Sequence, residues 1–114
     1  MKDDKVFIGH ILDEVSFLIE RSRGLKFEDF EKDETLKRAF ARSLEIIGEA
    51  TKNISPDYRE RHQEIEWKEL TGLRDKLIHH YFGLSWERVW NVITDFVPKL
   101  KEPMETLLRE DKGG

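Results

Sequence analysis

The 114-residue sequence contains no cysteine, few helix-breaking residues and no long apolar run. Without cysteine, disulfides, thiolate nucleophiles, zinc ribbons and iron–sulfur clusters are excluded, and a reducing compartment is expected. No apolar segment approaches the ~20 residues that a membrane span needs. The first four residues also lack the basic-then-apolar order of a signal peptide. We therefore expect a cytoplasmic protein with no membrane partner.

The charge balance is slightly acidic. Charged residues make up 39% of the chain and hydrophobic residues 38%, and 24 acidic against 20 basic residues give a net charge of −4. The electrostatic field of the whole protein does not attract nucleic-acid phosphates, so any contact with nucleic acid must depend on a local group of basic residues. The length suits one domain over residues 1–114, with a thin core that would gain from burial against a partner.

Apolar residues recur at helical spacing along nearly the whole chain, and no stretch keeps the alternation of a strand. The fold class is therefore predicted to be all-α. Short connections between long helices favour an antiparallel up-down bundle. The first expected helix runs from residue 4 to just before Gly24, and a short turn around residues 27–30 follows it. The other expected helices run from a cap at Asp33 to residue 54, from Pro56 to Arg61, from 66 to 82, and from a cap at Ser85 onward.

The last helix carries two internal prolines, Pro98 and Pro103. Its apolar stripe continues at helical spacing on both sides of them. This continuity predicts one helix with a proline kink and argues against two unrelated helices. Residues 111–114 are predicted to be a disordered tail.

The segment from residue 72 to residue 83 contains a charged residue, Arg74, at a position where an apolar residue is expected. On an ideal helix, Arg74 and Tyr81 fall about 20° apart and about 10 Å along the axis. Trp67 and Leu70 share this side, so Arg74 lies on an apolar face. Such a guanidinium needs a partner carboxylate, a neighbouring subunit or a ligand anion, unless it reaches water from the edge of the stripe.

Asp75 and His79 are four residues apart and face one another on a different side of this helix. A carboxylate there can orient the imidazole as a base or acid, although an ordinary surface pair is the alternative. Arg74 and His79 are about 140° apart on a regular helix. They converge only if the arginine reaches round, if a π-type turn widens the helix, or if a second subunit supplies one of them. His79 and His80 are adjacent and point apart, so spacing predicts no metal site.

Arg74, His79 and Tyr81 reproduce the pattern Arg-x4-His-x-Tyr, which resembles the motif of the HepT toxins of the HEPN superfamily. The sequence around this motif also resembles that of the family. Residues 42–50 (RSLEIIGEA) resemble the second-helix signature of that family, and residues 80–90 resemble its passage from the motif to the last helix. The resemblance covers roughly residues 5 to 109 in consistent order.

This resemblance implies a HEPN-like bundle that forms a homodimer, with the two motif helices lining a cleft between subunits. It implies a metal-independent endoribonuclease that needs no cofactor and acts as a toxin. Its antitoxin would be a cognate MNT-type nucleotidyltransferase that silences it by transferring AMP from ATP to the motif tyrosine. By this resemblance Arg74 and His79 are catalytic, Asp75 supports them, and Tyr81 is the AMP acceptor.

The chemistry of these side chains fits that expectation. Metal-free RNA cleavage needs a base for the ribose 2′-OH, a proton donor for the leaving 5′-oxygen, and a cation at the phosphorane-like transition state. His79 can perform one or both proton steps, and Arg74 can bind phosphate oxygens in bidentate fashion. AMP on Tyr81 would place an anion where substrate phosphate should bind.

Two other interpretations stay open. The chain can be a binding module that serves as partner and substrate of a nucleotidyltransferase without nuclease turnover. The acidic balance and the lack of a broad basic stripe favour this alternative. It can also be a structural helical dimer whose motif residues are only polar groups of an interface.

Overall fold

The computed structural model describes residues 4–79 and 85–110, with all of their side chains except those of residues 77–79. In this part of the chain every regular element is helical, which confirms the all-α prediction. The elements are α1 (Asp4–Ser22), α2 (Phe27–Glu31), α3 (Glu34–Lys52), α4 (Pro56–Arg61), α5 (Trp67–His79), α6 (Trp86–Asn91), the π-helical turn η2 (Val92–Phe96) and α7 (Pro98–Glu110).

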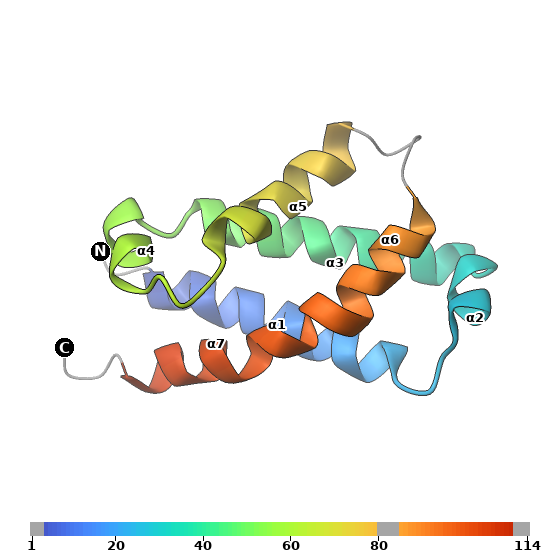
Figure 1. Ribbon diagram of the computed structural model, residues 1–114, viewed down its shortest axis with the longest axis horizontal. Helices are drawn as coiled ribbons and strands as arrows, with labels where there is room; N and C mark the ends of the chain where they lie inside the picture. Colours follow the sequence, from blue (N-terminus) through green and yellow to red (C-terminus); the bar gives the residue numbers. More distant parts are fainter. Residues whose placement is uncertain (1–3, 80–84, 111–114) are drawn as a thin grey trace.

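The long helices alternate in direction, as an up-down bundle requires (Figure 1). In the packing order α5 lies on α3, α3 on α1, and α1 on α7. The molecule measures 46 × 29 × 20 Å, so its shortest dimension is about two helix layers at interaxial distances of about 8–10 Å. Helix α5 therefore lies at one edge of a thin slab.

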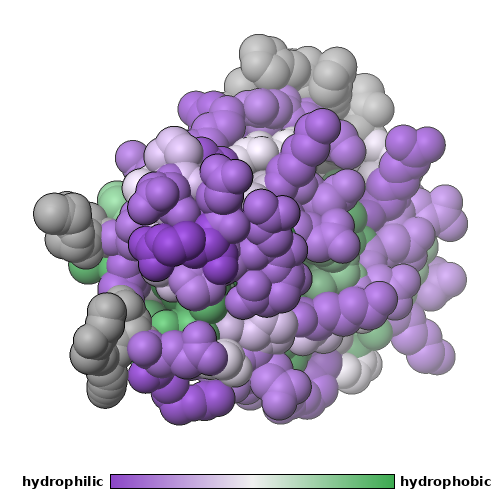
Figure 2. Space-filling model, turned by 60° about the vertical axis from the view of Figure 1, so that its left-hand side comes forward, coloured by the Kyte–Doolittle hydropathy of each residue, from purple (hydrophilic) through white to green (hydrophobic). Residues whose placement is uncertain are grey.

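The core is built from one stripe of each long helix. In α1 the fully buried residues recur every three or four positions, as an amphipathic helix requires. Corresponding stripes of α3 and α7 face it. These core residues are Ile8, Ile11, Val15 and Leu18 of α1, Phe40, Leu44 and Ile47 of α3, and Leu100, Met104 and Leu107 of α7. Figure 2 shows one face of the surface, where hydrophilic side chains dominate and hydrophobic atoms show only in small areas.

Helix termini follow the local signals of the sequence. The carboxylate of Asp33 accepts the N–H of Leu36 at 3.0 Å, and the hydroxyl of Ser85 accepts the N–H of Arg88 at 3.3 Å. Gly24 has a φ of 79°, in the left-handed region that favours glycine after a helix. The predicted caps at Asp33 and Ser85 are therefore confirmed, and so is the predicted end of the first helix before Gly24.

Residues 27–30, predicted as a turn, form most of the short helix α2. The side chain of Phe30 is fully buried, and its ring stacks on Phe40 at 5.4 Å and on Trp90 at 5.1 Å between centroids. Burial of this aromatic ring stabilises a helix that is too short to be stable by itself.

The predicted kink occurs at η2, which ends two residues before Pro98 (Figure 1). The N–H of Val97 donates to the carbonyl of Val92, five residues earlier, at 2.9 Å. In a regular helix the ring of Pro98 would clash with the carbonyl four residues before it, and the wider turn relieves this contact. Pro103 lies inside α7. The predicted tail at 111–114 is outside the described residues.

No described helix combines the length and the apolar character needed to span a bilayer.

Helices α3 and α5 approach each other most closely at Gly48. A Cβ built on Gly48 would lie 2.6 Å from the Cβ of Arg74 and 2.8 Å from its backbone nitrogen. These distances are shorter than van der Waals contact, so only glycine allows the two helices to lie this close. Gly48 thereby fixes where the backbone of Arg74 rests on α3.

Replacing Gly48 with alanine should destabilise the protein. Forcing a methyl group into this contact costs about 1–3 kcal/mol, offset in part by the ~1 kcal/mol better helix propensity of alanine. Thermal unfolding followed by circular dichroism should give a lower melting temperature. Gly9→Ala in α1 is the matched control, because a Cβ there meets nothing within 4 Å and should raise stability. A Gly48→Ala protein as stable as Gly9→Ala would contradict this packing.

Candidate active site

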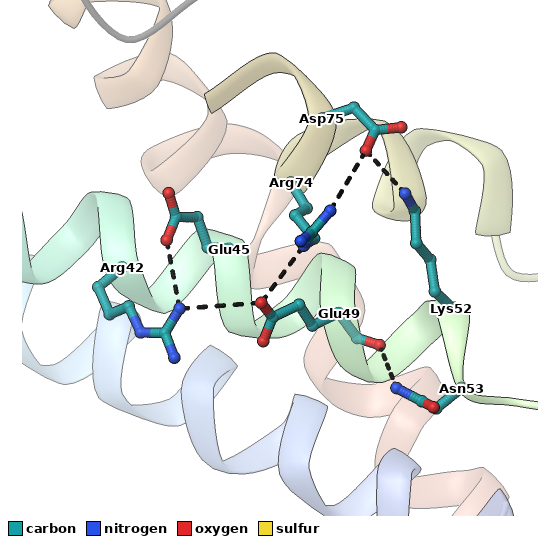
Figure 3. Close-up of polar contacts among 7 residues, drawn as sticks. All are labelled: Arg42, Glu45, Glu49, Lys52, Asn53, Arg74 and Asp75. Atoms are coloured by element: carbon teal, nitrogen blue, oxygen red, sulfur yellow. Dashed lines mark hydrogen bonds and ion pairs between the residues drawn. The ribbon is translucent and has the colours of Figure 1, made fainter. Parts of the chain in front are cut away.

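Arg74 lies on α5 with its side chain turned toward α3. Its Nε lies 3.3 Å from Oε2 of Glu49, to which it donates a hydrogen bond (Figure 3). The Arg74 side chain remains 33% exposed. Of the ways to accommodate an arginine on this face, the structure uses a partner carboxylate from the neighbouring helix.

Asp75, the next residue, points to the same edge of α3. Its Oδ1 accepts a hydrogen bond from Nζ of Lys52 at 2.7 Å and lies 3.8 Å from Nη1 of Arg74. The longer distance exceeds that of a hydrogen bond, so Lys52 holds the Asp75 oxygen more directly than Arg74 does. Asp75 is therefore anchored to α3 beside the guanidinium.

A second arginine approaches Glu49 from the other side. Nη1 of Arg42 lies 3.3 Å from Oε1 of Glu45 and 3.9 Å from Oε2 of Glu49 (Figure 3). Three cations and three carboxylates thus form one polar cluster between α3 and α5, consisting of Arg42, Glu45, Glu49, Lys52, Arg74 and Asp75. The formal charges of this polar cluster cancel.

The other predicted site residues lie at the end of α5 and beyond it. His79 is the last residue of α5, and its side chain is not among those described. Tyr81 lies outside the described residues. Helix α5 is α-helical from Trp67 to His79, so the π-type turn considered between Arg74 and His79 does not occur. The side chains of Arg74 and His79 can therefore converge only if the arginine reaches round the helix or if a second subunit supplies one of them.

Glu49 and Lys52 contact the predicted site residues, yet sequence reasoning assigned neither of them a role. Together with Arg42 and Glu45 they follow helical spacing along α3, which indicates a charged stripe on one side of that helix. The sequence alone is enough to find this charged stripe. It does not show which helix packs across the stripe, because the packing depends on the contact at Gly48.

Most of the chain matches one known protein family. A family model described as "Ribonuclease HepT-like" matches residues 11–107. This range includes the whole polar cluster and the three motif positions 74, 79 and 81.

Curated relatives match over nearly their full length. A "Putative RNase" of Caldanaerobacter subterraneus is 49% identical over 98% of this chain and 100% of its own. A "Probable ribonuclease HepT" of Thermococcus cleftensis is 40% identical over 93% of this chain and 96% of its own. A "Putative RNase" of Methanocaldococcus jannaschii is 37% identical over 98% and 93%. No solved structure gives a significant match.

Proposed function

Because the chain belongs to the HepT-like ribonuclease family, we propose that it is an endoribonuclease that cleaves RNA without a metal ion and is the toxin of a toxin–antitoxin pair. The observation that carries the proposal is the placement of Arg74. Its guanidinium is bound by Glu49 between α3 and α5, and its side chain is one third exposed, on the helix that ends at His79.

In the proposed reaction, His79 takes the proton of a ribose 2′-OH. The 2′-oxygen attacks the adjacent phosphorus, and the bond from phosphorus to the 5′-oxygen breaks. A protonated imidazole returns a proton to the leaving oxygen. Arg74 binds the nonbridging oxygens, whose negative charge grows in the transition state. The products are a 2′,3′-cyclic phosphate and a 5′-hydroxyl end.

The proposed enzyme is a homodimer. Positions 74 and 79 lie about 140° apart on the regular helix α5, so a second subunit can complete each site more readily than one helix can. Sedimentation at micromolar concentration should show a species of twice the 13.6 kDa chain mass. A single 13.6 kDa species would refute the dimer.

Cleavage should persist in EDTA. The proposed proton transfers and charge stabilisation use only imidazole and guanidinium groups. The experiment compares the purified protein on one RNA oligonucleotide with EDTA and with added Mg²⁺. Cleavage that stops in EDTA and returns with the metal would overturn the metal-independent mechanism.

Regulation is proposed to act through Tyr81. An MNT-type nucleotidyltransferase would attach AMP to the tyrosine hydroxyl with release of pyrophosphate from ATP. The resemblance at residues 74–81 supports this assignment. The added phosphate is an anion that Arg74 can bind in place of RNA.

A non-catalytic substrate subunit of a nucleotidyltransferase is the second candidate. It is favoured by the net charge of −4 and by the polar cluster, in which Arg42, Lys52 and Arg74 each contact a carboxylate. Such pairing weakens attraction to RNA. Modification by the nucleotidyltransferase together with no RNA cleavage in any buffer would favour this candidate.

A further inference from the structure

We propose that Glu49 is a positioning residue that holds the guanidinium of Arg74 by its Nε, so that the two Nη groups are presented to an RNA phosphate. This inference rests on the proposed ribonuclease function. It assigns a role to a residue of α3 that lies outside the Arg-x4-His-x-Tyr motif.

The contact geometry supports a division of the guanidinium donors. An arginine offers donors at Nε and at its two Nη groups in a rigid planar fork. Glu49 accepts from Nε at 3.3 Å, and Oδ1 of Asp75 lies 3.8 Å from Nη1, beyond hydrogen-bond distance. The end of the fork can therefore form two parallel bonds to a phosphate while Glu49 keeps the plane of the guanidinium fixed.

The preceding residue of α3 acts on the same side chain. Gly48 lets the backbone and Cβ of Arg74 rest directly on α3, and Glu49 binds the other end of the side chain. Arg74 is thus held at both ends by consecutive residues of one helix. A long, flexible side chain loses much of its freedom before substrate arrives, which reduces the entropic cost of binding the transition state.

Stability alone does not account for Glu49. The side chains of Glu49 and Arg74 are 42% and 33% exposed, and ion pairs this exposed contribute only about 0–1 kcal/mol. A carboxylate beside a phosphate-binding cation also repels RNA. Orientation of Arg74 by Glu49 can offset this repulsion. The two effects predict opposite changes in RNA cleavage when Glu49 is replaced, because loss of orientation lowers kcat whereas loss of repulsion strengthens RNA binding.

The test compares three variants in steady-state RNA cleavage. Glu49→Met removes the acceptor and the charge, whereas Glu49→Gln removes the charge but keeps an acceptor oxygen. Glu45→Met is the matched control, since Glu45 lies on the same helix and contacts Arg42. We expect kcat to fall about 10- to 100-fold in Glu49→Met, to fall less in Glu49→Gln, and to stay near wild type in Glu45→Met.

Simple electrostatics predicts a different pattern. If Glu49 acted only by repelling RNA, both Glu49 variants would show the same lower KM with an unchanged kcat, and Glu45→Met would behave in the same way. That result would overturn the proposal. Equal melting temperatures among the variants would show that the loss of kcat is not a loss of fold.

A second readout does not depend on activity. The NMR signal of the Arg74 Nε–H group, assigned by its absence in Arg74→Lys, should be sharp in wild type and Glu45→Met and broadened or lost in Glu49→Met. An unchanged signal in Glu49→Met would contradict the positioning role. If the wild-type protein cleaves no RNA, the proposed function fails, and this signal alone decides whether Glu49 orients Arg74.

Discussion

RNA cleavage should fall by about 10²- to 10⁴-fold when His79 is replaced by alanine, and by about 10²- to 10³-fold when Arg74 is replaced by alanine. Without His79 no positioned group takes the 2′-OH proton. Without Arg74 the charge that develops on the phosphate loses its paired donors. Initial rates on a single RNA oligonucleotide, with all proteins at equal concentration, measure both effects.

Arg74→Lys separates charge from geometry in the same assay. Lysine keeps the positive charge but has neither the Nε that Glu49 binds nor a planar fork. We expect it to restore little of the lost activity. Helical circular dichroism should be unchanged in both Arg74 variants, because Arg74 is partly exposed and its ion pairs stabilise the fold only weakly. Wild-type rates in His79→Ala would remove its catalytic role and favour the binding-module alternative.

Modification of Tyr81 should abolish cleavage in proportion to its extent. Incubation with the cognate nucleotidyltransferase, ATP and Mg²⁺ should add one or more AMP units to the tryptic peptide that contains Tyr81. The sequence spacing predicts that this residue is on the same side of a helix as Arg74 and about 10 Å along its axis, within reach of an extended arginine and a phosphodiester. Pairing of the new phosphate with Arg74 would block the RNA site.

The chain supplies its own control for this modification. Tyr58 is its other tyrosine, and it is only 5% exposed, so it should receive no AMP. Tyr81→Phe should remain active in the presence of the nucleotidyltransferase and ATP unless binding alone neutralises it. Modification at Tyr58, or full modification of Tyr81 with undiminished cleavage, would show that the proposed switch is wrong.

Periodicity and caps were enough to predict the bundle. The stripes of α1, α3 and α7 are set by local spacing, and Asp33 and Ser85 act as caps through hydrogen bonds to residues three positions later. Helix α2 was missed because its stability comes from the contacts of Phe30 with Phe40 and Trp90, which are distant in sequence. Local patterns carry no information about such contacts.

The site could be predicted only in part for the same reason. Arg74 and Asp75 stand out by their spacing within one helix, and the need of Arg74 for a partner carboxylate follows from its charge. That the partners are Glu49 for Arg74 and Lys52 for Asp75 depends on how α5 crosses α3. This crossing is fixed by the close contact at Gly48, a feature of packing in three dimensions.

The chemical identity of the product ends tests the central claim most directly. The purified protein is incubated in EDTA with an RNA oligonucleotide and with the same sequence carrying 2′-O-methyl groups, and the products are identified by mass spectrometry. The proposed mechanism predicts 2′,3′-cyclic phosphate and 5′-hydroxyl ends from the RNA and no cleavage of the methylated oligonucleotide. Intact RNA, or 5′-phosphate ends formed only with a divalent metal, would contradict it.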